Sequence, residues 1–463
     1  MPGSLNRTLP LCISTEQYFQ PGAGVRILIC LAIAACHTAF AHAAPDSNSI
    51  LSGYWCGSAE RDGIKHDIAV RVIANKGKLA GSVDWPSMGY FRTDLLRVDL
   101  QGTTVRLGVP LPLGSIKLVG QLSAGSIKGT LEPIGLVKGE WQSLGVAGAF
   151  ELRRTREPQS PYQTEDIRFA NGDVSLAGTL FLPPDASKRP AIVYIAGSGD
   201  ATRGDGSFLA DRLAQAGIAA FVYDKRGTGQ STGDWHEGGF DELADDAIAA
   251  LRLLQRRADV DAAQTGFVCQ SQGCWVAPIA MRRGAPAHFL VAQSGPAVAV
   301  AAEDLDYYRV TLTSQGFGEH EIAEAFELVT TNQRVSLGQA TWGELQRTIE
   351  RFHERPWFKS LGYEPEPATA PIRTFDRHIL EYDPTADINA LRIPALWIYG
   401  EADTIIPVKD AIAVIHRATS RPAPELVVLP RAGHSFTVSD TAIPHLAHGY
   451  PDVVIRWIVA INR

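Results

Sequence analysis

Residues 266–275 read GFVCQSQGCW, and they decide how the second half of this chain is interpreted. An apolar, strand-like run ends at Gln270 and a helix-like run begins at Gly273, so Ser271 lies in a sharp turn between them. In a G-x-S-x-G pattern, that context exposes the serine as a nucleophile. Cys269 replaces the first glycine of the pattern. Because cysteine is small and buries readily, we expect the turn to form, with Ser271 as a nucleophile rather than an ordinary turn serine.

Two later segments supply an acid and a base. The stretch WIYGEADTIIP, residues 397–407, puts Asp403 directly after an apolar strand, and VVLPRAGHSF, residues 427–436, puts His434 in the loop after the next strand. A serine becomes nucleophilic when a base takes its proton, and a carboxylate holds that base in the right tautomer. Taken singly, Asp403 would be a turn residue and His434 a surface group. Their order and their places at strand ends predict a Ser-Asp-His triad.

The stretch IAGSGDATRGDG, residues 195–206, follows an earlier apolar strand and is the candidate oxyanion loop. An oxyanion hole needs two backbone N–H donors, one from the residue after the nucleophile and one from such a loop. We expect Gln272 to supply the first, and Ser198 or Gly199 the second. A dinucleotide-binding loop is the competing interpretation, and it is rejected because Thr202 occupies the position of the third glycine in G-x-G-x-x-G.

The pattern of elements changes along the chain and predicts two domains after an N-terminal segment. Residues 45–157 show short alternating strands with Gly-rich breaks, including a hairpin turn at 75–78, and predict a small all-β accessory domain. Residues 158–463 alternate apolar strands with amphipathic helices, which predicts a mostly parallel, doubly wound sheet. Helical sequence from about 297 to 372 interrupts this alternation. We expect it to form a lid over the carboxyl ends of the strands.

The N-terminal segment, residues 1–44, has the features of an export signal. Apolar residues 27–36 follow a short basic start near Val25, where we expect translation to begin, and Ala41-His-Ala43 fits a cleavage site. A buried core helix is the alternative. Export predicts a periplasmic or secreted protein. Cys36 ends a lipoprotein-like sequence and is the candidate for a lipid anchor, which we rank below soluble export.

Composition excludes several partner classes. The net charge of −7 gives no reason to expect nucleic acid or anionic lipid as a partner, and the presumed mature chain contains no apolar run of bilayer-spanning length. The 12 histidines show none of the spacings typical of zinc sites, so no metal is expected. The oligomeric state cannot be predicted from this sequence.

Several polar residues have structural interpretations. Asp224 and Arg226, in the loop after a strand, are expected to brace that loop by charge-assisted hydrogen bonds. The acid pair at 245–246 is expected on the solvated face of a helix. Cys269 and Cys274 would flank the nucleophile turn, and that tight geometry disfavours a disulfide between them.

The segments AGSGDATRGDG, YDKRGTGQSTG, GFVCQSQGCW, YGEADTIIPV and AGHSF resemble those of the α/β-hydrolase superfamily. Within it, the chain is similar to bacterial exported hydrolases related to serine aminopeptidases and prolyl-oligopeptidase-type catalytic domains. The resemblance covers residues 165–463. It implies the triad Ser271, Asp403 and His434, no cofactor, and hydrolysis of an ester, thioester or amide through an acyl-enzyme. We expect a small-molecule or peptide acyl substrate, with a carboxylic ester as the first choice.

Two other functions stay open at this stage. A serine aminopeptidase would need acidic residues in the lid to capture an α-amino group, and Glu303-Asp304 and Glu319-His-Glu321 are the candidates. Alternatively, the β-domain would bind a glycan or another envelope component beside a hydrolase-like domain. Its candidate groove residues are aromatic, although core packing is the expected use of most of them: Trp55, Trp85, Tyr90 and Trp141.

Overall fold

The computed structural model describes residues 50–61, 63–111, 114–137, 140–143, 148–184, 188–362, 378–439 and 443–463. The expected export signal and Cys36 lie outside these residues. The chain divides into two compact units between Gln159 and Ser160. In the described part of the chain, no helix is both long enough and apolar enough to cross a membrane.

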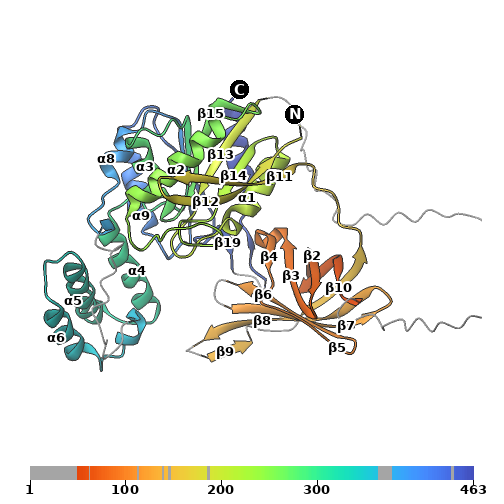
Figure 1. Cartoon of the computed structure of the whole chain (residues 1–463). Helices are drawn as coiled ribbons and strands as arrows, with labels where there is room; N and C mark the ends of the chain where they lie inside the picture. Colours follow the sequence, from red (N-terminus) through yellow and green to blue (C-terminus); the bar gives the residue numbers. More distant parts are fainter. Residues whose placement is uncertain are drawn as a thin grey trace, which may run out of the picture. The chain divides into compact units, whose positions relative to one another are not determined.

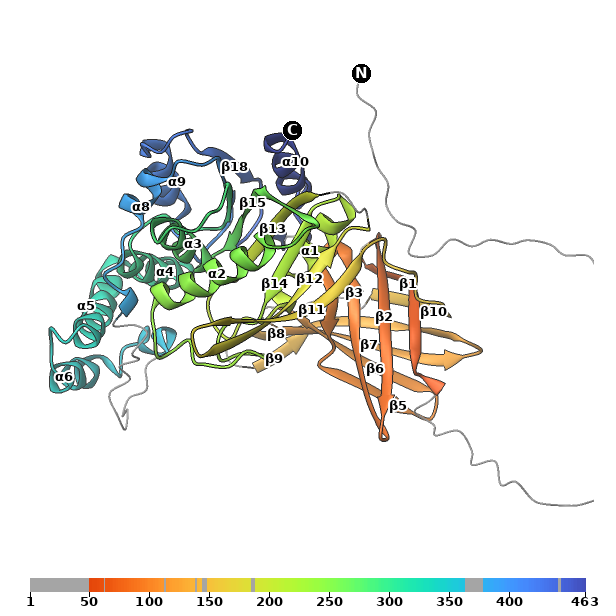
Figure 2. The ribbon, with the colours of Figure 1, turned by 45° about the horizontal axis from the view of Figure 1, so that its top comes forward.

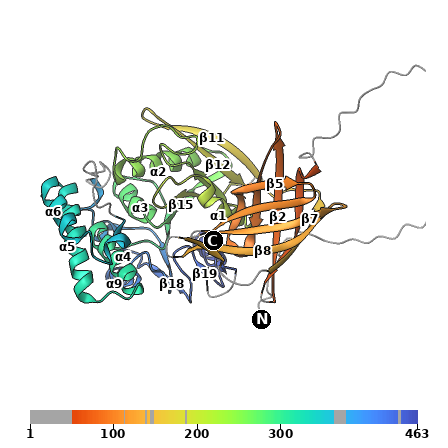
Figure 3. The same cartoon turned by 90° about the horizontal axis from the view of Figure 1, so that it is seen from below.

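The N-terminal unit contains one ten-stranded antiparallel sheet and confirms the expected all-β region (Figure 1). The sheet order is β4-β3-β2-β1-β10-β8-β7-β6-β5, and β9 pairs with β8. The sheet curls so that its first strands cross over its later ones (Figures 2 and 3). Its strands are β1 (Gly53–Arg61), β2 (Ile64–Asn75), β3 (Lys78–Trp85), β4 (Tyr90–Asp94), β5 (Arg97–Gln101), β6 (Thr104–Leu111), β7 (Gly114–Ser123), β8 (Ser126–Val137), β9 (Glu140–Ser143) and β10 (Gly148–Thr155).

Local sequence accounts for the hairpin between β2 and β3. Lys76 and Gly77 form its two-residue loop, both with positive φ, and Asn75 pairs with Lys78. Two residues in that conformation match the twist of the flanking strands. The aromatic side chains of this unit serve mainly as core, because Trp55 and Trp85 are both 0% exposed. These two tryptophans are therefore not available to line a groove.

The second unit is built on an eight-stranded mixed sheet in the order β11-β12-β14-β13-β15-β16-β17-β18. The pairs β11–β12 and β12–β14 are antiparallel, and the pairs from β14 to β18 are parallel. The expected α/β sheet is therefore confirmed, with an antiparallel start. Its strands are β11 (Gln163–Asn171), β12 (Val174–Leu182), β13 (Arg189–Ile195), β14 (Ala219–Tyr223), β15 (Val260–Gln270), β16 (Phe289–Gln293), β17 (Ala395–Gly400) and β18 (Glu425–Leu429).

The order of connections reverses beside β13, and this fixes where the site lies. From β13 the chain moves to β14 on one side, and from β14 it returns past β13 to β15. Because parallel crossovers are right-handed, the two connecting helices cover opposite faces of the sheet. Ligands of open α/β sheets bind at the carboxyl ends of the strands where such a reversal occurs. Here those strands are β13 and β15.

The helices that cover the sheet follow this winding (Figure 1). Helices α2 and α3 pack in one hydrophobic cluster with the inner strands. That cluster includes Leu251, Phe267, Trp275 and Trp397. The covering helices are α1 (Gly204–Gln215), α2 (Phe240–Gln255), α3 (Gly273–Arg282), α8 (Thr385–Ala390), α9 (Val408–Arg417) and α10 (Asp452–Ile461).

A helical insertion lies between β16 and β17. It comprises α4 (Val300–Ser314), α5 (Glu319–Ser336), α6 (Trp342–Phe352) and the short helix η3 (Phe358–Leu361). These helices bury a hydrophobic cluster of their own, with Leu312, Leu328, Leu345 and Trp357 among its members. Helices α5 and α6 lie to one side of the sheet and its covering helices (Figures 1 and 2).

Candidate active site

Ser271 occupies a strained turn between β15 and α3. Its φ is 51°, a left-handed conformation that non-glycine residues rarely adopt. A Cβ atom on Gly273 would lie 2.3 Å from the carbonyl oxygen of Ile195, so only glycine fits where α3 meets β13. On the same side, a Cβ on Gly197 would lie 3.3 Å from the Ser271 Cβ. The turn therefore has the strand–helix geometry that the sequence predicts for a nucleophile.

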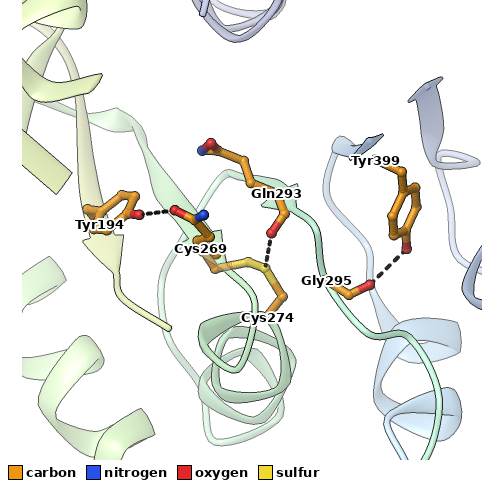
Figure 4. The surroundings of a disulfide bond; sticks show 7 residues. Tyr194, Cys269, Cys274, Gln293, Gly295 and Tyr399 are labelled. Atoms are coloured by element: carbon orange, nitrogen blue, oxygen red, sulfur yellow. Dashed lines mark hydrogen bonds between the residues drawn. A yellow bond between two sulfur atoms is a disulfide. The ribbon is translucent and has the colours of Figure 1, made fainter. Parts of the chain in front are cut away.

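The disulfide between Cys269 and Cys274, which the tight turn disfavours on sequence grounds, is present in the structure. The two residues form a disulfide, and their Cα atoms are 5.1 Å apart, which is within the usual range (Figure 4). The reversal of the chain at Ser271 brings the end of β15 beside the start of α3, and the two cysteines therefore lie close enough to bond. The Cys274 Sγ lies 3.7 Å from the carbonyl oxygen of Gln293. The bond thus encloses the four residues of the turn and anchors it beside β16.

Asp403 and His434 lie together although 31 residues separate them. Nδ1 of His434 is 2.8 Å from Oδ2 of Asp403, whose side chain is wholly buried. The other carboxylate oxygen accepts hydrogen bonds from the backbone N–H groups of Ile405 and Ile406 at 2.9 and 3.3 Å. Gly400 lets the two loops approach, because a Cβ there would lie 2.3 Å from the carbonyl oxygen of Ala432. A carboxylate oxygen accepts hydrogen bonds, so this contact favours the tautomer with the proton on Nδ1, and Nε2 is then the candidate base.

One dipeptide at the end of β16 connects the serine to the histidine. The carbonyl oxygen of Gln293 accepts a hydrogen bond from the Ser271 N–H at 2.9 Å. The next residue, Ser294, donates its hydroxyl to the carbonyl oxygen of His434 at 2.7 Å. Among the described residues, the Ser271 hydroxyl forms no hydrogen bond. Such bonds are often long in unliganded enzymes and tighten with substrate. The structure therefore brings the three candidate residues to one edge of the sheet.

The three candidate oxyanion donors lie around Ser271. Gln272 follows it at the start of α3, and Ser198 and Gly199 lie in the loop after β13, with Gly199 at a φ of 77°. Within the part of the chain that the structure describes, the backbone N–H groups of these three residues donate to no protein acceptor. Unused donors near a nucleophile are what an oxyanion hole requires.

The loop after β14 is braced by charge-assisted hydrogen bonds of Asp224 and Arg226, as expected, and the charged partners of both residues come from outside the loop. Asp224 accepts hydrogen bonds from the Arg203 guanidinium and backbone and from the N–H of Gln230. Burial alone would raise the pKa of Asp224, but these bonds outweigh burial and lower it. Arg226 pairs with Asp246 of α2 at 2.7 Å, and Asp246 is 1% exposed. The expectation of a solvated face is therefore wrong at Asp246.

The loop holds a further residue that the sequence analysis missed. Lys225 is buried beside the oxyanion loop, and it lines a pocket with Ile195, Ala196, Tyr223, Leu243 and Val276. Its neighbours in sequence, Asp224 and Arg226, are charged as well, so no pattern distinguishes Lys225 from them. Only its burial would have pointed to a role for Lys225, and the burial of a lysine in a polar loop cannot be predicted from the sequence.

Of the candidate acidic residues in the insertion, Glu303 is close enough to Asp403 for their charges to interact. It sits in the first turn of α4, and its pKa is raised to about 8 by burial and by the nearby carboxylates of Asp304, Asp306 and Asp403. Glu319 and Glu321 have structural roles instead. Glu319 pairs with an arginine at the surface, and Glu321 caps the start of α5.

A mixed α/β sheet that carries a strained serine at its switch point is the architecture of α/β hydrolases, and this chain belongs to that superfamily. It is a hydrolase. Residues 186–335 match the family described as serine aminopeptidase, S33.

The similar proteins include enzymes named as esterases. Over 346 residues, which cover 71% of this chain and 75% of the relative, the chain is 24% identical to Esterase EstD of Thermotoga maritima. Among solved structures, an esterase from Pyrococcus furiosus is similar with a TM-score of 0.42 at 15% identity, covering 65% of this chain and 90% of that one. A hypothetical protein from Pseudomonas aeruginosa has a TM-score of 0.42 at 17% identity, covering 65% and 94%.

Proposed function

We propose that this protein is a serine hydrolase that cleaves carboxylic esters, with Ser271 as nucleophile, His434 as general base and Asp403 as the residue that orients it. The observation that carries the proposal is the buried Asp403–His434 contact of 2.8 Å at the sheet edge where Ser271 is held in a left-handed turn. The esterase name of the Thermotoga relative supports the choice of an ester.

The chemistry follows from the proton positions. Asp403 keeps the proton of His434 on Nδ1, so Nε2 accepts the proton of Ser271 as its Oγ attacks the acyl carbon. The N–H groups of Gln272 and of Ser198 or Gly199 stabilise the negative oxygen of the tetrahedral intermediate. His434 then donates the proton to the leaving alcohol, and water releases the acyl group from Ser271 by the same steps. The helical insertion acts as a lid in this proposal.

Removal of the nucleophile tests the assignment. We expect Ser271→Ala to hydrolyse p-nitrophenyl butyrate at no more than about 10⁻³ of the wild-type rate and to lose labelling by a fluorophosphonate probe. Ser126→Ala, the same change in an exposed hairpin of the other unit, is the control and should keep wild-type activity. Wild-type turnover or labelling in Ser271→Ala would contradict the proposal.

Export is the second part of the proposal. The N-terminal segment has the order of a secretion signal. The Cys269–Cys274 disulfide supports it, because disulfides persist mainly in oxidising compartments. Fractionation of cells that express the full chain, followed by N-terminal sequencing, tests this. Intact protein that stays in the cytoplasm with its first residues attached would contradict it.

Aminopeptidase activity is the alternative, and Glu303 is the observation in its favour. A carboxyl group that other carboxylates surround gains from a cation, and the α-amino group of a peptide would supply one. In that case Glu303→Gln lowers turnover of aminoacyl p-nitroanilides but not of p-nitrophenyl butyrate. Absence of anilide hydrolysis by the wild-type protein excludes the alternative and leaves the esterase proposal intact.

A further inference from the structure

Lys225 joins both halves of the candidate oxyanion hole. It lies two residues after β14 and is 6% exposed. Its Nζ donates to the carbonyl oxygens of Gly197 and Gly199 at 2.6 and 2.9 Å, and to Oε1 of Gln272 at 3.3 Å. An ammonium group has three N–H donors, so these contacts use all of them. Two of them hold the loop after β13, and the third holds the residue that follows the nucleophile.

These contacts constrain the direction of the N–H groups. In a planar trans peptide, the C=O and the following N–H point in opposite directions. A bond that fixes the carbonyl of Gly197 therefore fixes the direction of the Ser198 N–H, which is one of the candidate donors. The contact with the Gln272 side chain ties the residue that carries the other donor to the same cation.

The burial of Lys225 imposes a desolvation penalty on its positive charge. Among the described residues, no carboxylate oxygen lies within 4.0 Å of its Nζ, which lies over the ring of Trp235, 4.9 Å from the ring centroid. Burial lowers the pKa of Lys225 to about 8, while the charges of Asp205 and Asp200 act in the opposite direction.

The other ionisable groups around it have partners or are exposed. The adjacent carboxylate of Asp224 is bound to Arg203, and the half-exposed His236 ring stacks on the ring of Trp235. An apolar side chain would avoid the desolvation penalty of a buried cation. Perturbed, buried charges of this kind concentrate at functional sites.

We propose that Lys225 is a positioning residue for the oxyanion hole, holding the 197–199 loop and Gln272 so that the N–H groups of Ser198 and Gln272 converge on one point beside Ser271. The inference rests on the proposed function, since the hole acts only if Ser271 forms an acyl-enzyme. Lys225 itself touches neither the substrate nor the reacting atoms.

Replacement of the lysine separates positioning from binding. For Lys225→Met we expect kcat for p-nitrophenyl butyrate to fall about 10²-fold, as when one oxyanion donor is lost, with KM changed by less than about two-fold. The variant should still be labelled at Ser271 by a fluorophosphonate to full stoichiometry, only more slowly, because the nucleophile and its base are untouched. Lys188→Met, an exposed lysine of the same unit, is the control and should match the wild type.

A pH profile gives a second readout, which also serves if Lys225→Met does not fold. We expect wild-type kcat to decline above pH 8, as the ammonium loses its proton. Gln272→Glu puts a carboxylate beside Lys225 and should move that decline upward by about one pH unit. An unchanged kcat in folded Lys225→Met, or a decline that does not move in Gln272→Glu, would overturn the inference alone. A wild-type protein that neither hydrolyses the ester nor labels at Ser271 would overturn the proposed function and this inference together.

Discussion

Replacing Asp403 by asparagine changes a proton position without changing the shape of the site. Oδ1 of Asp403 accepts two backbone N–H groups, those of Ile405 and Ile406. In Asp403→Asn the amide oxygen keeps that place, because an NH₂ group cannot accept those bonds. The NH₂ group must then face Nδ1 of His434. A donor at that position forces the ring proton onto Nε2. The protonated Nε2 can then no longer accept the proton of Ser271.

The size of the effect follows from that tautomer change. A base locked in the wrong tautomer lowers kcat about 10⁴-fold, which corresponds to about 5.4 kcal/mol at 1.36 kcal/mol per factor of ten. The assay is steady-state hydrolysis of p-nitrophenyl butyrate, with thermal unfolding to verify the fold. Asp410→Asn, the same change at an exposed position of α9, is the control and should keep wild-type kcat. A kcat for Asp403→Asn within ten-fold of wild type would refute the assigned role of the carboxylate.

Three further predictions concern stability, each measured by urea unfolding. Asp246→Ala removes the buried carboxylate from the largely buried Arg226 guanidinium, which keeps only its bond to the carbonyl oxygen of Glu242, and should lower the free energy of unfolding by about 3 kcal/mol. Asp245→Ala, on the half-exposed side of α2, should lower it by less than about 1 kcal/mol, and equal losses would contradict the buried pair. Replacing Cys269 and Cys274 together by alanine opens a short loop and should cost about 2 kcal/mol; wild-type stability under non-reducing conditions would contradict the bond. The pKa of Glu303 is about 8 in the folded state and 4.5 for the free side chain. Between pH 4.5 and 8 the folded state therefore binds one more proton than the unfolded state, and the free energy of unfolding falls as the pH rises through that range. Glu303→Gln should flatten this fall, and a slope equal to that of the wild type would contradict the raised pKa.

The elements of the hydrolase unit and the places of its three candidate residues were predictable from local patterns. Ser271, Asp403 and His434 each follow an apolar strand, and the carboxyl ends of parallel strands meet at one edge of a sheet. Periodicity and chain order therefore carry enough information to assemble the site.

The partners of the charged residues were not predictable in the same way. Asp224 and Arg226 lie two residues apart, yet each binds a residue from another element, Arg203 and Asp246 respectively. Those pairings depend on how α1 and α2 approach the loop after β14. The burial of Lys225 depends on the same packing. The Cys269–Cys274 disulfide was disfavoured on sequence grounds because the distance across the turn is set by the reversal of the chain and not by the spacing of the cysteines.

Among the described residues, most of the helical insertion packs in a hydrophobic cluster that has no member in common with the cluster of the sheet, which the insertion joins near Val300. Mutations that repack Leu328 or Trp357 therefore leave the strands beneath Ser271 and His434 in place. In a protein built in this way, the sequence of the helical insertion can diverge while the candidate residues Ser271, Asp403 and His434 keep their positions. If the insertion acts as the proposed lid, we expect an exchange of α4–α6 with the insertion of a relative to alter selectivity.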